Sequence, residues 1–288
     1  MFTVFTEIMK GKLMSVITHT TTTSADGTTI GYRITGAGPG ARTVVLVEGA
    51  LATQDNGDGK ALTEALAGDH RVVTYDRRGR GESRSADSFT LATELADLAA
   101  VIDAAGGVDI VCGFSSGAVI ALYDAARTGR QARYILFEPP LVGSDPAAVP
   151  AAAQMARLGE LLAEGRNSGA VQHWMSRIVG IPAPIVWVLR QTLPRAKRPD
   201  GPANARSLLG DAAVVDATRF GIPAEASVIG QPTVVVNGSK SVKKLRDAAE
   251  AVAAAIPGAE LRGLEGESHT PAAAPMAALV RELTAAAR

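Results

Sequence analysis

The sequence has few of the residues that mark several classes of protein. It contains one cysteine and four histidines among 288 residues, which excludes an internal disulfide and a cysteine-rich zinc cluster. It has no run of about 18 apolar residues, so we expect no membrane-spanning helix. The lone Cys112 lies in an apolar, strand-like stretch, where a small buried side chain is the expected role.

An excess of charge of either sign is also lacking. The chain has 29 basic and 29 acidic residues, so its composition does not attract nucleic acid or an anionic membrane. Glu7, Lys10 and Lys12 interrupt the first residues, which lack the apolar core of a signal peptide. We therefore expect a loose tail over residues 1–18, a cytoplasmic location, and neither nucleic-acid nor membrane partners. The oligomeric state cannot be read from the sequence.

Strand-like and helix-like segments alternate along most of the chain. The two β-rich runs of "HTTTTSADGTTIGYRIT" form a predicted hairpin. Six further strand patterns follow in "TVVLVEG", "RVVTYD", "VDIVCGF", "ARYILFEPP", "PTVVVNG" and "AELRGLEG", with helical patterns between most of them. This order predicts an α/β fold with a mostly parallel, eight-stranded sheet and helices on both faces. We assign residues 19–140 and 231–288 to this core domain.

Residues 141–230 break the alternation of strands and helices. This segment is rich in proline, has no clear β-α unit and contains both tryptophans of the chain, Trp174 and Trp187. We expect it to form a mainly helical insertion that folds over the sheet. The tryptophans have two open interpretations, which are packing inside the insertion and a wall of a substrate pocket beneath it.

A G-x-S-x-G pattern lies between a predicted strand and a predicted helix. In "GFSSG" the central residue is Ser115, and the flanking glycines are Gly113 and Gly117. A sharp strand-to-helix turn at this point forces unusual backbone angles on the serine and exposes its hydroxyl at the carboxyl edge of the sheet. We therefore predict that Ser115 is a nucleophile.

A serine nucleophile needs a base, which we expect to be His269. It follows the last strand in "GESHTPAAAP", at the carboxyl edge where Ser115 is expected. His19 lies in the N-terminal hairpin, His70 precedes a strand, and His173 lies in the insertion. The backbone amides of Ser116 and Ala50 are the predicted oxyanion donors. Ala50 is chosen by position alone, because it follows the strand "VVLVEG".

From about residue 20 onward the chain resembles the α/β-hydrolase fold superfamily. The resemblance rests on "VVLVEGAL", "VVTYDRRGRGES", "GFSSGAVIAL", "PTVVVNG" and "GESHTPAAAP", in that order. It implies that the insertion is the cap of that family and that a carbonyl substrate meets water above Ser115. These motifs are specific for the fold and not for one reaction.

Two positions depart from the family pattern. Glu48-Gly49 stands where the family usually has His-Gly, and Ser241 stands where the family usually has its catalytic aspartate. Glu138 in "YILFEPP" ends the strand after the Ser115 unit, a place where some family members carry the acid, so it is our first candidate for the partner of His269. Glu48 is the second candidate. It is otherwise expected to contact substrate or to brace the turn "RRGRG" through an arginine.

These residues predict a serine hydrolase that needs no cofactor or metal. Ser115, His269 and Glu138 would act on a small ester, lactone or activated carbonyl compound, and the apolar cap favours an uncharged, hydrophobic substrate. Two alternatives remain open at this point. One is a non-hydrolytic enzyme of the same fold, of the lyase or cyclase type, and the other is a member that binds a ligand without catalysis.

Overall fold

The computed structural model describes residues 3–5, 16–38, 40–83, 88–141, 152–192, 202–217 and 221–285. A single mixed sheet runs through it in the order β1-β2-β3-β5-β4-β6-β7-β8-β9. The strands are β1 (Thr3–Phe5), β2 (Val16–Thr23), β3 (Thr29–Gly36), β4 (Thr43–Val47), β5 (Arg71–Tyr75), β6 (Ile110–Phe114), β7 (Arg133–Phe137), β8 (Thr233–Gly238) and β9 (Glu260–Leu264).

Eight of these strands are the ones predicted from the sequence, and β1 is an addition. The pairs β1–β2, β2–β3 and β3–β5 are antiparallel, whereas β4–β5 and all pairs from β4 to β9 are parallel. Strand β1 lies inside the predicted loose tail, where Val4 pairs with Thr18 at the edge of the sheet. Residues 3–5 thus extend the open edge of the hairpin within the segment that is predicted to be a loose tail.

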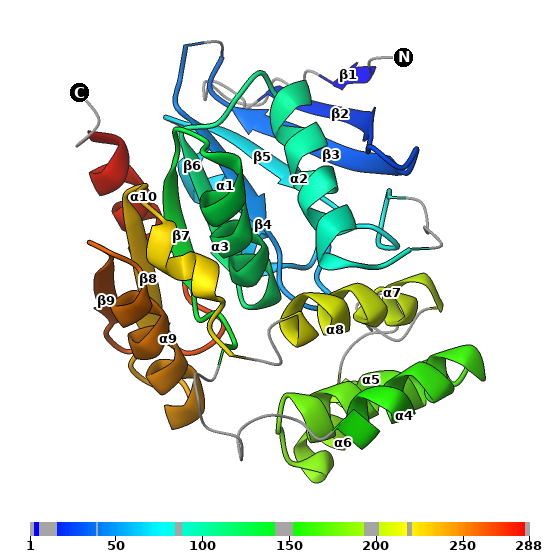
Figure 1. The fold of residues 1–288 in the computed structure, drawn as a ribbon. Coiled ribbons are helices and arrows are strands. Elements are labelled where there is room, and N and C mark those ends of the chain that lie inside the picture. Colours follow the sequence, from blue (N-terminus) through cyan, green and yellow to red (C-terminus); the bar gives the residue numbers. More distant parts are fainter. Residues whose placement is uncertain are drawn as a thin grey trace.

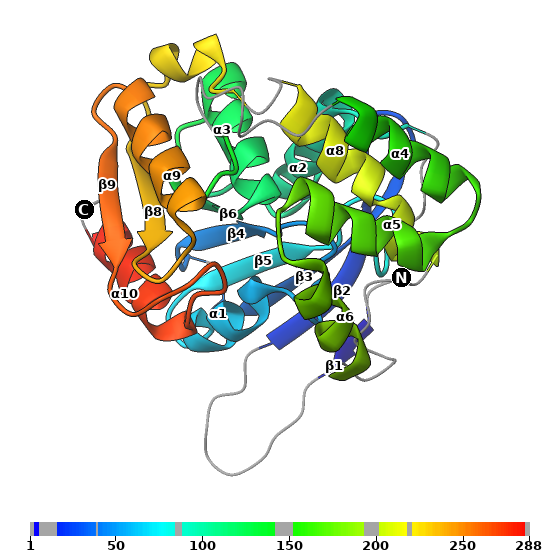
Figure 2. The same ribbon diagram turned by 90° about the horizontal axis from the view of Figure 1, so that it is seen from below.

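The central strands are covered on both faces. Every residue of β4, β6 and β8 is buried, as their continuous apolar runs predict. Helices α2 (Leu91–Ala104), α3 (Ser116–Thr128) and α9 (Lys243–Ala255) cover one face, and α1 (Asp58–Leu66) and α10 (Ala273–Ala285) cover the other (Figures 1 and 2). Cys112 is fully buried on β6, as expected.

Helices dominate the described part of the segment between β7 and β8. They are α4 (Ala152–Ala163), α5 (Asn167–His173), a π-helical turn η2 (Trp174–Ile178), α6 (Ala183–Thr192), α7 (Pro202–Arg206), α8 (Leu208–Asp216) and a 3₁₀ turn η4 (Ala224–Val228). Helices α4, α5 and α6 form a layer apart from the sheet, and α8 lies between that layer and the core (Figure 1). No helix in the described ranges is both long and apolar enough to cross a membrane.

Candidate active site

Ser115 lies at the turn from β6 into α3 in a strained backbone conformation. Its φ of 51° and ψ of −119° are rare for a residue with a side chain. The turn is tight on both sides. A Cβ on Gly113 would lie 2.5 Å from the Gly117 carbonyl oxygen, and a Cβ on Gly117 would lie 2.1 Å from that of Val47. Only glycines fit at these two positions, which accounts for the spacing of the motif.

Glu138 and His269 are hydrogen-bonded to one another. The His269 Nδ1 and Glu138 Oε2 atoms are 2.5 Å apart, although the residues are 131 positions apart in the chain. Glu138 directly follows β7, has a φ of 45° and is fully buried. Its second carboxyl oxygen accepts a 2.8 Å hydrogen bond from the Gly238 amide. Both oxygens of the carboxyl group are therefore held in place.

The surroundings favour the ionised form of Glu138. Burial by itself would raise the pKa of this carboxyl, but hydrogen bonds from His269 and the Gly238 amide outweigh it and lower the pKa. The buried Ser241 hydroxyl acts in the same direction, although it forms no hydrogen bond of good geometry. An ionised Glu138 accepts the Nδ1–H of His269 and leaves Nε2 of the ring as the proton acceptor.

The end of β7 joins the nucleophile to this pair. The Ser115 amide donates a 2.9 Å hydrogen bond to the carbonyl of Phe137, the residue before Glu138. The Phe137 and His269 rings have centroids 6.4 Å apart. Ser115, Glu138 and His269 thus surround one strand end, as their positions in the sequence predict, while their roles in catalysis remain predictions.

The loop after β4 touches the nucleophile turn. A Cβ on Gly49 would lie 3.3 Å from the Ser115 Cβ, which places Ala50 one residue from this contact. Ser116 opens α3, so its amide is among the unpaired donors of a helix start. The two predicted oxyanion donors therefore belong to segments on either side of Ser115.

Glu48 directly follows β4, and its buried carboxyl group lies against the start of α1. Its Oε1 accepts a 2.9 Å hydrogen bond from the Gly59 amide, and Oε2 has no hydrogen-bond partner. Burial is the main cause that raises the pKa of this carboxyl to about 8, and Asp58 adds to the effect. The Glu48 backbone carbonyl, and not its side chain, accepts a hydrogen bond from Arg77. The predicted brace to the arginine-rich turn is therefore made by the main chain.

Asp58, the first residue of α1, is a neighbour that the sequence did not single out. Burial raises the pKa of its carboxyl, and the nearby His269 opposes this shift. A carboxyl group on the α1 side thus lies near enough to His269 for the two groups to interact electrostatically. The "GDGK" stretch contains no motif, so only the placement of α1 reveals this proximity.

The two tryptophans have different surroundings. Trp174 is 4% exposed and packs in an apolar cluster of the cap that also includes Leu51 from the loop after β4. This position fits the packing interpretation. Trp187 on α6 is 59% exposed. His173, also in the cap, bonds the Gln154 carbonyl at 2.8 Å, in keeping with a packing role.

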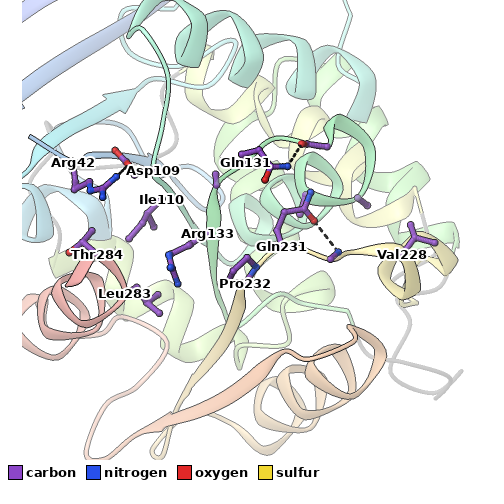
Figure 3. Close-up of a pocket in the computed structure, with 15 residues that line it drawn as sticks. Arg42, Asp109, Ile110, Gln131, Arg133, Val228, Gln231, Pro232, Leu283 and Thr284 are labelled. Carbon is purple, nitrogen blue, oxygen red and sulfur yellow. Dashed lines mark hydrogen bonds and ion pairs between the residues drawn. The ribbon is translucent and has the colours of Figure 1, made fainter. Parts of the chain in front are cut away.

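A cavity of about 570 Å³ lies away from these residues (Figure 3). It opens at the amino ends of β6 and β7 and is lined by Ile110, Arg133 and an ion pair between Arg42 and Asp109. None of the predicted site residues lines it. Because chemistry in such sheets gathers at the carboxyl ends of the strands, we do not assign this cavity to the active site.

The fold and the strand-end residues define a capped α/β-hydrolase type of protein. Residues 55–282 match the model of the alpha/beta hydrolase family. An alpha/beta hydrolase from Sphaerobacter thermophilus is 38% identical, with a TM-score of 0.82 over 92% of this chain and 100% of that chain. The chain belongs to the alpha/beta hydrolase family and has the fold of that family.

More distant solved structures share the fold. An esterase from Thermogutta terrifontis is 23% identical, with a TM-score of 0.67 over 92% of this chain and 97% of that chain. An enol-lactonase from Burkholderia xenovorans is 22% identical, with a TM-score of 0.61 over 92% of this chain and 99% of that chain. No curated protein matches the sequence.

Proposed function

We propose that the protein is a serine hydrolase that cleaves a small ester, lactone or activated carbonyl compound through an acyl-enzyme on Ser115. The observation that carries the proposal is the 2.5 Å hydrogen bond between His269 and Glu138. It supplies a carboxylate partner for the histidine although Ser241 occupies the position of the usual acid. The strained Ser115 turn beside this pair supports the choice of nucleophile.

In the proposed mechanism His269 removes the hydroxyl proton of Ser115 through Nε2 while its Nδ1–H stays bonded to Glu138. The Ser115 oxygen attacks the substrate carbonyl, and the Ala50 and Ser116 amides stabilise the oxyanion that forms. His269 then gives the proton to the leaving alcohol. Water, deprotonated by the same histidine, releases the acid product and restores the serine.

The proposed substrate class rests on the apolar cap. The apolar cluster of the cap includes Leu51 from the oxyanion loop, the segment at residues 48–52 after β4, and Ala50 packs against the same cluster. This favours an uncharged, hydrophobic small molecule. The names of the esterase and the enol-lactonase agree with carbonyl substrates of this kind, although at their identities they support the fold alone.

The test combines turnover of p-nitrophenyl acetate and butyrate with intact-mass detection of a fluorophosphonate adduct. Wild type should turn over both esters and gain one adduct, and Ser115→Ala should do neither. Glu138→Gln should lower kcat by roughly 10³ to 10⁴-fold, because His269 loses the carboxylate that fixes its tautomer. Asp247→Asn on α9, which removes an exposed carboxylate paired with Lys243, is the matched control and should leave both readouts unchanged.

Two outcomes count against the proposal. An adduct that persists in Ser115→Ala would show that Ser115 is not the nucleophile. Wild-type kinetics in Glu138→Gln would show that Glu138 is not the acid of the triad. A second candidate rests on the unusual Glu48 and Ser241, and it is a non-hydrolytic or ligand-binding member of the family. A wild-type protein that binds a hydrophobic ligand without turning over either ester would favour that candidate.

A further inference from the structure

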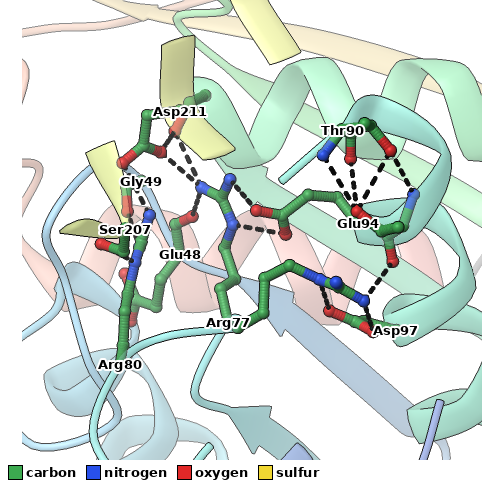
Figure 4. Close-up of polar contacts among 12 residues, drawn as sticks. Glu48, Gly49, Arg77, Arg80, Thr90, Glu94, Asp97, Ser207 and Asp211 are labelled. Carbon is green, nitrogen blue, oxygen red and sulfur yellow. Dashed lines mark hydrogen bonds and ion pairs between the residues drawn. The ribbon is translucent and has the colours of Figure 1, made fainter. Parts of the chain in front are cut away.

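A buried ionic cluster joins the cap to the core beside the nucleophile turn (Figure 4). Arg77 and Arg80 come from the turn after β5, Glu94 from α2 and Asp211 from α8, and all four side chains are at most 1% exposed. Asp211 accepts from Arg77 at 2.8 Å and from Arg80 at 2.7 Å. Two positive and two negative groups thus neutralise one another inside the protein, an arrangement that needs every partner in place.

The two arginines also hold the backbone of the oxyanion loop. Arg80 Nη1 donates to the Gly49 carbonyl at 2.6 Å and to the Ala52 carbonyl at 3.1 Å. Arg77 Nη1 donates to the Glu48 carbonyl at 3.3 Å. Charged donors therefore contact three backbone carbonyls within five consecutive residues, and such hydrogen bonds are stronger than neutral ones.

These contacts determine the direction of the predicted oxyanion donor. In a trans peptide the C=O and N–H groups point in opposite directions. With the Gly49 carbonyl aimed at Arg80, the Ala50 N–H is aimed away from it. Leu51, between the two carbonyls that Arg80 holds, has a φ of 63°. A conformation of this kind persists only where the surroundings impose it.

The second oxyanion donor is linked to the same cluster. The Ser116 hydroxyl accepts from Arg77 at 3.0 Å and donates to Asp211 at 2.8 Å. Asp211 therefore contacts Ser116, which carries one oxyanion donor, and it is linked through Arg80 to the loop that carries the other donor, the Ala50 amide. It belongs to the cap, so the placement of α8 and the shape of the oxyanion hole depend on each other.

We propose that Asp211 is a positioning residue for the oxyanion hole, which it aligns through Arg80 and Ser116. The inference rests on the proposed serine hydrolase function. Asp211 contacts no reacting atom in this arrangement. Its effect is on the orientation of the Ala50 and Ser116 amides, so its loss weakens stabilisation of the transition state more than it weakens substrate binding.

The neighbouring pair of Arg78 and Asp97 provides a matched control. Both side chains are fully buried, and Asp97 accepts two 2.7 Å hydrogen bonds from Arg78. Arg78 belongs to the same turn as Arg80, but its other hydrogen-bond partners among the described residues are Asp26 and the carbonyls of Ser88 and Thr93, none of which lies in the oxyanion loop. Asp97→Asn therefore weakens a buried ion pair of the same type without touching the oxyanion loop.

The kinetic experiment compares Asp211→Asn with Asp97→Asn on p-nitrophenyl butyrate. Both variants should have lower melting temperatures than wild type. Asp211→Asn should lower kcat by about 10 to 100-fold with KM within about twofold, less than the loss of a whole oxyanion donor. Asp97→Asn should keep the wild-type kcat. If Asp211→Asn does not fold, Ser207→Ala removes only the hydroxyl that accepts from Arg80 Nε at 3.0 Å, and it should lower kcat by a few fold.

Amide hydrogen exchange tests the positioning without relying on turnover. Asp211→Asn, or Ser207→Ala in its place, should speed exchange in the peptide that covers residues 48–52, and Asp97→Asn should not. Equal exchange there in the variant and the control, or an equal loss of kcat in both, would overturn the proposal. Absence of Ser115-dependent turnover in wild type refutes the proposed function instead, and the exchange result then decides alone whether Asp211 holds this loop.

Discussion

The Glu48 carboxyl is buried with one oxygen unpaired, so its neutral form is the stable one in the folded protein. Its pKa rises from 4.5 to about 8 on folding. Between these values the folded chain binds more protons than the unfolded chain, and the free energy of unfolding falls as pH rises, by at most about 1.4 kcal/mol per pH unit. Glu48→Gln keeps the shape of the side chain and cannot ionise. We therefore expect the free energy of unfolding of the variant minus that of wild type to increase as the pH rises from 5 to 8.

Urea unfolding at pH 5, 6.5 and 8 measures this difference. The exposed residue Glu265 supplies the control, because Glu265→Gln removes a carboxyl group that water already solvates. It should leave the pH dependence unchanged. A stability difference between Glu48→Gln and wild type that is the same at all three pH values would contradict the expectation.

The sequence predicts the site residues that directly follow strands of the sheet. It does not predict the site residues whose position depends on how a helix packs against the core. Ser115, Glu138 and His269 each follow a strand, and the parallel order of the strands gathers them at one edge. Asp211 reaches Arg80 across 131 positions. That contact depends on where α8 settles on the core, and no spacing in the sequence encodes it. Asp58 likewise required the placement of α1.

At the scale of elements, the start of α1 packs closely against the Glu48 side chain. A Cβ on Gly59 would lie 2.6 Å from Glu48 Oε1 and 3.0 Å from Leu46 Cδ1. Alanine favours a helix over glycine by up to about 1 kcal/mol, but here the collision dominates. We expect Gly59→Ala to destabilise the protein by about 1 to 3 kcal/mol, the usual cost of overpacking, as measured by urea unfolding.

The matched substitution is Gly159→Ala in α4, where a Cβ meets nothing within 4 Å. It should stabilise the protein by about 0.5 to 1 kcal/mol through helix propensity alone. Adding Glu48→Ala to Gly59→Ala removes the colliding carboxyl and should recover part of the loss. If Gly59→Ala behaves like Gly159→Ala, the close packing of Glu48 against α1 is refuted.

The elements themselves were largely readable from the sequence. The buried strands are continuous apolar runs, and the helices between them have apolar residues at helical spacing. The sequence does not predict strand β1, because three residues are too few to show a periodic pattern and they form a strand only by pairing with β2. The sequence does not predict the π-helical turn at 174–178. Its residue Trp174 is buried in the apolar cluster of the cap, and this packing depends on distant residues and not on local propensity.

At the scale of the whole molecule, the cap and the core share both an apolar cluster and an ionic cluster. Leu51 of the core packs among cap residues, and Asp211 of the cap pairs with Arg80 of the core. Separating the two parts would expose the first cluster and leave buried charges of the second without partners, which is costly. We therefore expect cap and core to unfold in one cooperative transition.

The tryptophans provide a selective probe of this coupling. Both of them, Trp174 and Trp187, lie in the cap, so tryptophan fluorescence follows the cap while far-UV circular dichroism follows the whole chain. Trp187→Phe leaves the buried Trp174 as the sole tryptophan, which excitation at a wavelength selective for tryptophan reports. In urea the two signals of this variant should have the same midpoint and the same slope. A fluorescence transition at lower urea would mean that the cap opens while the sheet stays folded, and the ionic cluster would then not bind the two parts into one unit.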